Sequence, residues 1–259
     1  MAAYDLLARH YDAVTGDCAT EAAFVDHVLS RARPRPVTVL EVACGTGGII
    51  ASLAGRYRVA GLDISPGMLA VARDKLPRGT PLHLADMSRF RLGVRFDAVI
   101  CVYHGVNHLL GFPAWESFFD RAAEHLNDGG MLVFDLLTPG NLQNMASSPP
   151  MIQRFGRHYL RLAVHAGDRG RFGWNIEVLE RQRDGGYRSL TEVIETASFP
   201  PARIRAALGQ RFAGVQIIES DGGIAGDGEN RTWFVGTKPG PATRPRPYPG
   251  PPGPPGGSR

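Results

Sequence analysis

Two histidines, His104 and His108, are the residues whose type and position best suit acid–base chemistry in this sequence. They follow residues 96–103, an apolar run that is typical of a buried strand. Ligands of open α/β sheets bind at the carboxyl ends of the strands, so both histidines should lie at the mouth of a site. A neutral imidazole, with a pKa of about 6.5, can accept a proton. We predict that His108 is the base or orients a nucleophile, with His104 second. The alternative is that each only caps backbone groups.

A glycine-rich turn at residues 44–48, Cys-Gly-Thr-Gly-Gly, separates two apolar runs. The first run, residues 37–42, reads as a buried parallel strand, and helical spacing of apolar residues follows the turn. The second run ends in Asp63. Strand, glycine turn, helix, strand and acid form the first half of a doubly wound nucleotide-binding fold. In that fold Asp63 would accept hydrogen bonds from ribose hydroxyls.

The turn does not fit a dinucleotide. A dinucleotide site needs a third glycine three residues after Gly47, where this chain has Ile50. Glu41 also ends the first strand, and its carboxylate would repel a pyrophosphate. The same carboxylate suits a cationic ligand that carries an ammonium group. An NAD-dependent dehydrogenase is therefore disfavoured.

Residues 40–47, Leu-Glu-Val-Ala-Cys-Gly-Thr-Gly, resemble motif I of the class I S-adenosylmethionine (SAM)-dependent methyltransferases. Residues 61–65, Gly-Leu-Asp-Ile-Ser, resemble the segment that follows this motif. The resemblance covers residues 1–238 and is strongest over 37–137. It implies an α/β fold with a doubly wound, seven-stranded, mostly parallel, Rossmann-like sheet. It also implies SAM as the cofactor and S-adenosylhomocysteine (SAH) as the product.

The resemblance also places the cofactor-binding residues. Asp86 resembles the family residue that accepts a hydrogen bond from the adenine amino group, although it could instead cap a turn. Met68 could flank the adenine ring or only pack in the core. The expected cofactor-binding residues are Glu41, Ala43, Gly45, Gly47, Asp63, Ile64, Met68, Asp86, Met87 and Val102.

Residues 101–109, Cys-Val-Tyr-His-Gly-Val-Asn-His-Leu, discriminate between subfamilies. Methyltransferases of nucleobase amino groups or glutamine side chains carry an Asn/Asp-Pro-Pro-Tyr-like motif here, which this chain lacks. His108-Leu109 resembles the His-Leu pair of small-molecule enzymes, including nucleotide-sugar N-methyltransferases. His104 departs from that group, which tends to have a small residue there. The resemblance implies methyl transfer to an amine nitrogen of an amino sugar or a specialised, antibiotic-like metabolite.

Two other functions stay open at this point. The first is an O-methyltransferase that uses His108 as a base against a phenol or hydroxyl group. The second is a non-catalytic nucleoside-binding module. Tyr11 is a further catalytic candidate, because a leading helix, here residues 3–32, covers the cofactor in many family members. It could equally be an aromatic residue packed in an amphipathic helix.

The alternation of strands and helices stops after residues 131–137, an apolar run that reads as the fifth strand of the sheet. A loop-rich passage over 138–150 precedes three strand-like stretches at 157–166, 171–183 and 187–199, which hairpin signals separate. These stretches predict an inserted antiparallel β cap. The last helix and two strands then follow, with the final strand antiparallel.

The sequence is thus divided into a SAM-binding core at 1–140 and 200–238, a substrate cap at 141–199, and a disordered Pro/Gly tail at 239–259. The predicted acceptor contacts are Tyr4, Tyr103, Asn107 and Trp174.

Charge and cysteine content restrict the partners. The chain has 29 basic and 25 acidic residues, but three of the arginines lie in the acid-free tail. The remainder is almost balanced, which is poor evidence for a nucleic-acid partner. The three cysteines show neither a disulfide framework nor paired metal-ligand spacing, so no metal is expected. With no signal peptide or membrane-spanning run, we predict a cytoplasmic protein with a small-molecule substrate and no membrane partner, and leave a homo-oligomer open.

Overall fold

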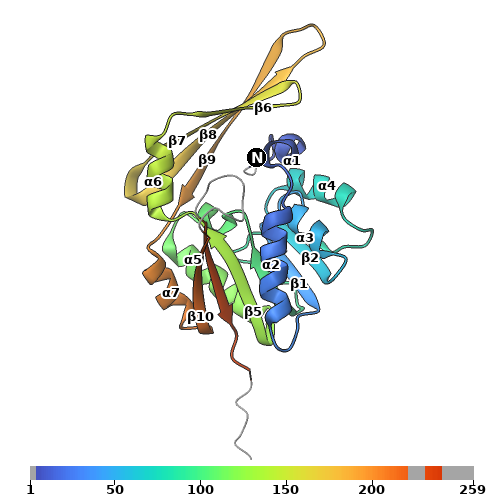
Figure 1. Ribbon diagram of the computed structural model, residues 1–259, viewed down its shortest axis with the longest axis vertical. Coiled ribbons are helices and arrows are strands. Elements are labelled where there is room, and N and C mark those ends of the chain that lie inside the picture. Colours follow the sequence, from blue (N-terminus) through green and yellow to red (C-terminus); the bar gives the residue numbers. More distant parts are fainter. Residues whose placement is uncertain (1–3, 221–230, 241–259) are drawn as a thin grey trace, which may run out of the picture.

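A seven-stranded sheet forms the base of the molecule in the computed structural model, which describes residues 4–220 and 231–240 (Figure 1). Its strand order is β10-β11-β5-β4-β1-β2-β3. The strands are β1 (Thr38–Val42), β2 (Arg58–Asp63), β3 (Leu82–Leu84), β4 (Phe96–Cys101), β5 (Leu126–Leu136), β10 (Ala213–Ser220) and β11 (Arg231–Thr237). β1 to β5 pair in parallel, and β11 runs antiparallel to both neighbours. The predicted fold class is confirmed.

Helices cover both faces of this sheet because successive strand residues point to opposite sides. Val39 packs against α2 (Ala19–Arg31) and α3 (Gly48–Leu53). Its neighbour Leu40 packs in the opposite cluster, with α5 (Phe112–Glu124) and α7 (Pro201–Leu208). A third cluster joins α3 to α4 (Pro66–Lys75). The doubly wound arrangement leaves the carboxyl ends of β1 to β4 at one edge.

Aromatic side chains fill the core beneath α5. Phe118, Phe119 and Phe134 are fully buried, and Phe134 of β5 stacks on Phe234 of β11 with ring centroids 5.2 Å apart. This contact joins the antiparallel final strand to the parallel part of the sheet. The core therefore continues across the point where strand direction changes.

A second, four-stranded antiparallel sheet, the cap sheet, lies beyond one end of the first (Figure 1). It consists of β6 (Met151–Phe155), β7 (His158–Ala166), β8 (Arg171–Arg181) and β9 (Tyr187–Ala197). Its β7–β8 and β8–β9 hairpins follow the predicted turn signals, whereas β6 was not expected. Leu7, just before α1 (Ala8–Thr15), packs among the inner residues of the cap sheet.

The loop predicted over 138–150 is wrong, because it contains helix α6 (Pro139–Ser147). Thr138 caps this helix: its hydroxyl accepts a hydrogen bond from the Asn141 N–H, and the Asn141 side chain accepts one from the Thr138 N–H. Pro139 stands at the first helical position, where its missing N–H costs nothing. Thr-Pro-Gly thus begins a helix here rather than a turn.

Residues 127–130, Asn-Asp-Gly-Gly, have the composition of a turn but belong to a strand. Helix α5 ends at Glu124, and residues 127–130 belong to β5 as an irregular stretch where its register to β4 shifts. Gly129 has a φ of 76°, and two backbone hydrogen bonds to Lys238 hold this stretch against the chain that follows β11.

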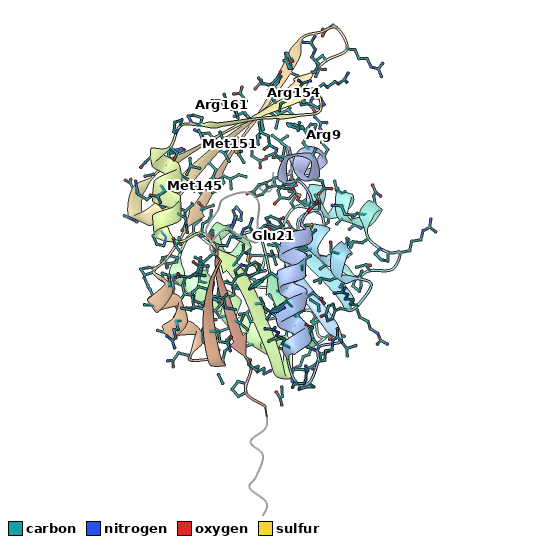
Figure 2. The ribbon with its side chains drawn as sticks, in the orientation of Figure 1. Arg9, Glu21, Met145, Met151, Arg154 and Arg161 are labelled. Carbon is teal, nitrogen blue, oxygen red and sulfur yellow. The ribbon has the colours of Figure 1, made fainter. Side chains whose placement is uncertain are left out.

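Charged side chains cover much of the cap sheet. Figure 2 places Arg154 and Arg161 on this sheet, with Arg9 of α1 beside it. Arg9 pairs with Glu180 at 2.7 Å. Within residues 4–220 and 231–240, no helix is long and apolar enough to cross a membrane. The predicted tail lies, apart from Pro239 and Gly240, outside the described residues.

Thr138→Ala should destabilise α6. The variant loses the cap of the first turn, so we expect a loss of about 1 kcal/mol in the free energy of unfolding and faster hydrogen exchange at Asn141. Urea unfolding and amide exchange measure these effects. Ser147→Ala, at the exposed far end of the helix, is the control. Equal effects of the two variants would show that Thr138 does not cap the helix.

Candidate active site

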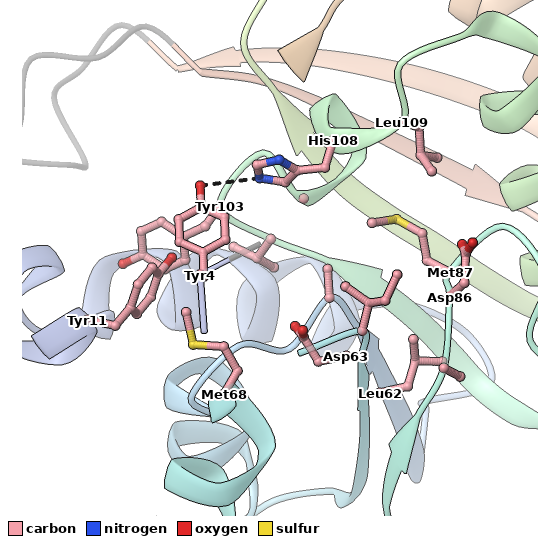
Figure 3. Close-up of a pocket in the computed structure, with 15 residues that line it drawn as sticks. Tyr4, Tyr11, Leu62, Asp63, Met68, Asp86, Met87, Tyr103, His108 and Leu109 are labelled. Carbon is pink, nitrogen blue, oxygen red and sulfur yellow. Dashed lines mark hydrogen bonds between the residues drawn. The ribbon is translucent and has the colours of Figure 1, made fainter. Parts of the chain in front are cut away.

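Three connected cavities lie at the carboxyl ends of the strands, where the fold class places a ligand site. The first, the sheet-end cavity, has about 290 Å³ and is shown in Figure 3. It is lined by Tyr4, Tyr11, Ala43, Leu62, Asp63, Ile64, Met68, Ala85, Asp86, Met87, Val102, Tyr103, Gly105, His108 and Leu109. Most of the predicted cofactor residues thus meet around one space.

The second cavity, the turn cavity, is smaller, about 40 Å³, and lies against the glycine-rich turn. Its lining includes Glu41, Cys18 and Thr46, and it shares Tyr11, Ala43, Val102 and Tyr103 with the sheet-end cavity. The two therefore form the wide and narrow ends of one elongated site.

The third cavity, the cap cavity, has about 270 Å³ and lies between the cap sheet and the core. It is lined by Tyr4, Leu7, Tyr11, Val14, Thr15, Tyr103, His104, Asn107, His108, Leu137, Met151, Gln153, Leu160, Leu162, Trp174, Ile176, Thr196 and Arg231. Tyr4, Tyr11, Tyr103 and His108 line both this cavity and the sheet-end cavity. A ligand in each would meet at these four side chains.

The glycine-rich turn is joined to the acid that ends β2. The Gly45 N–H donates to one oxygen of Asp63 at 2.8 Å, and the Ser65 N–H donates to the other at 2.8 Å. Gly45 and Gly47 have positive φ values of 52° and 74°, which only glycine adopts without strain. They shape the turn and line none of the three cavities. Burial raises the pKa of Asp63, whose oxygens keep lone pairs for a ligand.

Glu41 is the clearest electrostatic signal in the site. It is 2% exposed, lines the turn cavity, and has no hydrogen-bond partner for its Oε2 among the described residues. Burial, with the negative charges of Asp63 and Asp135, raises its pKa well above the usual range. A cationic ligand group in the turn cavity would offset this cost. The residues therefore fit a ligand with an ammonium group at this end.

Asp86 caps a turn, as one of its two interpretations predicts, and it also lines the sheet-end cavity. Its Oδ1 accepts hydrogen bonds from the N–H and the hydroxyl of Ser88, both at 2.8 Å. Among the described residues, the nearest charged partner of its Oδ2 is the Arg89 Nε at 3.9 Å. This second oxygen can accept from a ligand, so the predicted contact to an adenine amino group stays a prediction.

The first part of the described chain, residues 4–15, covers the site and is called the leading segment here. Asp5 accepts hydrogen bonds from the Ser65 hydroxyl and the Gly67 N–H at the start of α4. On α1, Asp12 accepts from Thr46 of the glycine-rich turn and pairs with Lys75 at 2.7 Å. These anchors bind both ends of the segment to the core.

Tyr4 and Tyr11, each directly before one of these two aspartates, line the sheet-end cavity (Figure 3). Their ring centroids are 5.8 Å apart and the rings are nearly perpendicular. Burial raises the pKa of both phenols, so both hydroxyls keep their protons. They can donate hydrogen bonds but do not act as bases.

His108 faces Tyr4 where the sheet-end and cap cavities meet. Its Nε2 is 3.4 Å from the Tyr4 hydroxyl, and its Nδ1 has no partner among the described residues. Burial lowers the pKa of His108 to about 4. The imidazole is therefore neutral at physiological pH and a much weaker base than an ordinary histidine. It can hold and orient an N–H or O–H donor.

Of the three cavities, His104 lines only the cap cavity, and a backbone hydrogen bond holds it in place. Its N–H donates to Asp135 at 3.0 Å, and burial, followed by the charge of Arg231, lowers the pKa of its imidazole well below the usual range. Tyr103 and His104 have positive φ values of 58° and 55°, an uncommon conformation for such residues. Strain of this kind concentrates at functional sites.

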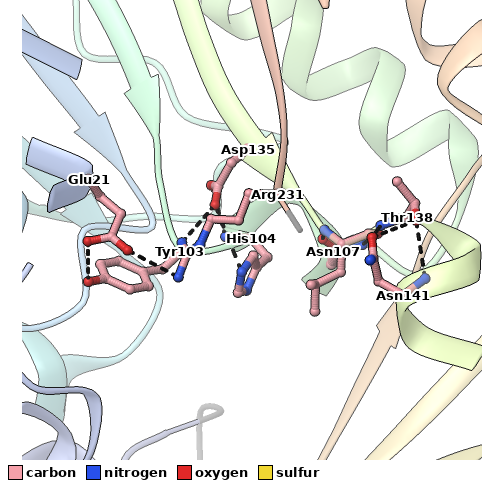
Figure 4. Close-up of polar contacts among 9 residues, drawn as sticks. Glu21, Tyr103, His104, Asn107, Asp135, Thr138, Asn141 and Arg231 are labelled. Carbon is pink, nitrogen blue, oxygen red and sulfur yellow. Dashed lines mark hydrogen bonds and ion pairs between the residues drawn. The ribbon is translucent and has the colours of Figure 1, made fainter. Parts of the chain in front are cut away.

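A buried ion-pair network, shown in Figure 4, holds this strained pair. Arg231 pairs with Asp135 at 3.1 Å and with Glu21 at 3.2 Å, and its guanidinium lies 4.8 Å from the centre of the Tyr103 ring. Glu21 also accepts a hydrogen bond from the Tyr103 hydroxyl at 3.0 Å. Sequence reasoning missed Arg231 and Glu21. The one available signal was Asp135, an acid inside an apolar strand that required a buried partner.

Asn107 and Trp174 also line the cap cavity, but their polar groups are engaged within the protein. The Trp174 indole N–H donates to Thr196 at 2.9 Å. Among the described residues, the hydrogen bonds of the Asn107 amide run to backbone groups, which gives it a structural role; its expected contact with the acceptor stays a prediction. Trp174 still presents its ring to the cavity. Within the described ranges, no group of three or more His, Cys, Asp or Glu side chains could hold a metal ion.

The chain is similar to known proteins over most of its length. Residues 39–130 match a family model described as a methyltransferase domain. A dTDP-3-amino-3,4,6-trideoxy-alpha-D-glucopyranose N,N-dimethyltransferase of Streptomyces venezuelae is 31% identical over 216 residues, which cover 82% of this chain and 89% of the relative.

Two of the solved structures that match the fold are sugar methyltransferases by their descriptions. A sugar N-methyltransferase from a Streptoalloteichus species has 29% identity and a TM-score of 0.75, covering 92% of this chain and 93% of that one. A SAM-bound amino pentose methyltransferase of calicheamicin biosynthesis from Micromonospora echinaspora has 28% identity and a TM-score of 0.73, covering 90% and 96%.

Glu41→Gln should stabilise the ligand-free protein as pH rises. Burial raises the pKa of Glu41 above about 4.3, its value in the unfolded chain. Above that pH the folded state therefore binds more protons than the unfolded state, and Glu41 lowers the free energy of unfolding as pH rises toward neutral. Glutamine removes that titration. The thermal midpoint of the variant should exceed the wild-type value at neutral pH, and the gap should close in acid. The exposed Glu219→Gln is the control; an equal pH trend in wild type and E41Q would contradict the expectation.

Proposed function

The chain belongs to the SAM-dependent methyltransferases, in the family of the Streptomyces venezuelae enzyme, and from this membership we propose that it methylates the amine nitrogen of an amino sugar. One observation carries the proposal. The cap cavity, of about 270 Å³, meets the sheet-end cavity at Tyr4 and His108, so an acceptor beneath the cap would present its reacting atom to a ligand of the core. The amino sugars named for the relatives are dTDP-linked, and we infer a nucleotide-linked acceptor for antibiotic-type natural products.

The cofactor is SAM, and the described residues fit it. When bound, SAM supplies a methyl group on a sulfonium, which a neutral amine can take up directly. Glu41 in the turn cavity would hold the ammonium group, because its buried carboxylate has an oxygen with no partner among the described residues. Asp63 would accept hydrogen bonds from ribose hydroxyls, and Asp86 from the adenine amino group. Met68 and Ile64 line the same cavity and would contact the adenine ring.

His108 and Tyr4 would orient the amine. One ring nitrogen of His108 faces the Tyr4 hydroxyl, and when that hydroxyl donates to the ring, the Tyr4 oxygen can accept an N–H of the acceptor. Holding that N–H fixes the direction of the nitrogen lone pair, which is the protein's main contribution to a displacement of this kind. With a pKa of about 4, His108 would not keep a proton taken from an ammonium ion. The amine would therefore have to enter in its neutral form.

The same low pKa weakens the O-methyltransferase alternative. A phenol has a pKa of about 10, so its proton would have to move to an imidazole whose pKa is about 4. His104 is no better, because burial also lowers its pKa. A non-catalytic nucleoside-binding module is disfavoured because the relative that matches most of the chain is an enzyme.

We also propose the division of labour predicted from the sequence. Residues 141–199 would form the substrate cap on a SAM-binding core at 1–140 and 200–238. The inner face of the cap sheet, with Trp174 and Ile176, lines the cap cavity and would choose the acceptor. We further propose that the protein is cytoplasmic, acts on a small molecule and has no nucleic-acid partner.

The direct test is SAH release from SAM with a panel of nucleotide-linked amino sugars, and mass analysis of the products. We expect one or two added methyl groups on the amine. The matched control is the same nucleotide sugar with a hydroxyl in place of the amine, which should remain unmodified. Turnover of the hydroxyl sugar or of a phenol in preference to every amine would overturn the proposal.

His108→Ala should lower kcat by about 10- to 100-fold, because the orienting contact is lost. His108→Asn, which keeps a polar group, should lose less. Because the imidazole stays neutral, the pH profiles of the wild type and H108N should run parallel above about pH 5.5. Initial rates at saturating SAM and acceptor measure this. A wild-type inflection near pH 6.5 that disappears in H108N would identify a titrating base instead.

A further inference from the structure

Asn107 lies where the chain crosses between the core and the cap sheet. The chain leaves the core at Leu137, directly after β5, and β9 ends at Ala197, from which the chain returns. The Asn107 amide nitrogen donates to the carbonyl oxygens of Leu137 at 3.1 Å and Ala197 at 2.9 Å. Its amide oxygen accepts from the Leu137 N–H at 3.0 Å. One side chain, 1% exposed, thus binds both crossings.

The same residue directly precedes His108. Both belong to the short 3₁₀ turn η1 (Gly105–His108), which Figure 4 shows beside the start of α6. A Cβ on Gly105 would lie 2.7 Å from Cys101 Sγ and 3.0 Å from the Ala43 side chain, so η1 is packed without free space beneath it. Gly105 thus packs one side of η1 against the core, and the Asn107 hydrogen bonds hold its other side.

We propose that Asn107 is a positioning residue for methyl transfer: its three hydrogen bonds fix the His108 ring to both cap crossings, so that ring and cap keep one register. The inference rests on the proposed function, since His108 is the orienting group there. Asn107 itself touches no reacting atom. It acts through the turn that carries His108.

Only a primary amide satisfies this position. The crossing offers one N–H donor, from Leu137, and two carbonyl acceptors, from Leu137 and Ala197. The amide of asparagine presents one acceptor and two donors, which matches this set completely. Loss of the amide would remove this partner from the Leu137 N–H and the Ala197 carbonyl, and leaving a buried polar group unpaired costs more than the bond itself contributes.

Asn107→Asp is the informative change because it keeps the shape and alters the hydrogen bonding. A protonated carboxyl group could still accept from the Leu137 N–H and donate to one carbonyl. An ionised one would face two carbonyl oxygens with no proton to offer. The three hydrogen bonds that join Asn107 to Leu137 and Ala197 should therefore weaken further as pH rises. We expect N107D to lower kcat by about tenfold near pH 6 and by more near pH 8, because small displacements of an orienting group reduce rate strongly.

Two variants separate positioning from general loosening. Ser198→Ala removes another hydrogen bond at the same crossing, from the Ser198 hydroxyl to the Leu137 carbonyl at 2.6 Å, but leaves η1 untouched. It should keep kcat within about twofold, with no pH trend. Asn144→Asp makes the same chemical change on the exposed face of α6 and should change nothing. Asn107→Ala, which buries no charge, replaces N107D if that variant does not fold.

A double-mutant cycle with His108→Asn gives the decisive result. If Asn107 acts through His108, the effects on kcat should not add, and N107D/H108N should resemble H108N alone. The SAH dissociation constant should change less than about twofold in N107D, N107A and S198A, because Asn107 and Ser198 do not line the sheet-end cavity. Additive losses, or equal losses in N107D and S198A without a pH trend, would overturn the proposal.

Hydrogen exchange keeps this test separate from the proposed function. The Leu137 N–H donates to the Asn107 amide oxygen, so its exchange should accelerate in N107A, which removes this acceptor, while Phe134 in β5 stays protected. This measurement needs no acceptor. If no amine is turned over by the wild type, the proposed function fails. If Leu137 exchange is unchanged in N107A, the proposed role of Asn107 fails.

Discussion

Burial of negative charge at the carboxyl edge of the sheet is the constraint on which the site depends. Glu41, Asp63 and Asp135 are all buried there, and burial raises the pKa of each. A hydrophobic core alone would never retain such groups, because unpaired buried carboxylates oppose folding. Backbone N–H groups partly satisfy Asp63, and Arg231 satisfies Asp135. Glu41 keeps one carboxylate oxygen without a hydrogen-bond partner among the described residues, and a cationic cofactor would pair with it.

One of these acids, Asp135, also helps to hold an uncommon backbone conformation. Ala43, Tyr103 and His104 all have positive φ values, and all three line the cavities. Left-handed conformations in residues with side chains persist only when surrounding contacts determine them. Here the Arg231 network fixes both ends of the Tyr103–His104 pair: Glu21 receives the Tyr103 hydroxyl and Asp135 receives the His104 N–H. The strained pair turns the chain at the end of β4, so that His108 reaches the boundary between the two large cavities.

Much of this was predictable from local sequence, and the limits of prediction are physical. β1, the glycine-rich turn, β2 and the cap of α4 are set by neighbouring residues, so apolar runs and Ser65-Pro66 indicate them directly. α6 was missed because Thr-Pro-Gly serves equally to begin a helix or a turn. Arg231 was missed because its partner Asp135 lies 96 residues away, and only strand pairing brings them together. Asn107 was placed on the right wall of the site, but sequence alone could not show that its amide is already used.

The leading segment then explains why the two large cavities act as one site. Tyr4 and Tyr11 line both, and the segment that carries them is anchored on two sides. Asp5 and Asp12 bind it to the core, while the Tyr4 N–H donates to Glu192 and His10 bonds to Glu180 at 2.6 Å, both on the cap sheet. A movement of this segment that opened one cavity would also remove a wall of the other. The cap is thus joined to the cofactor end at the leading segment and, through Asn107, at the turn that carries His108, so the two ligands would meet in a geometry set from both sides.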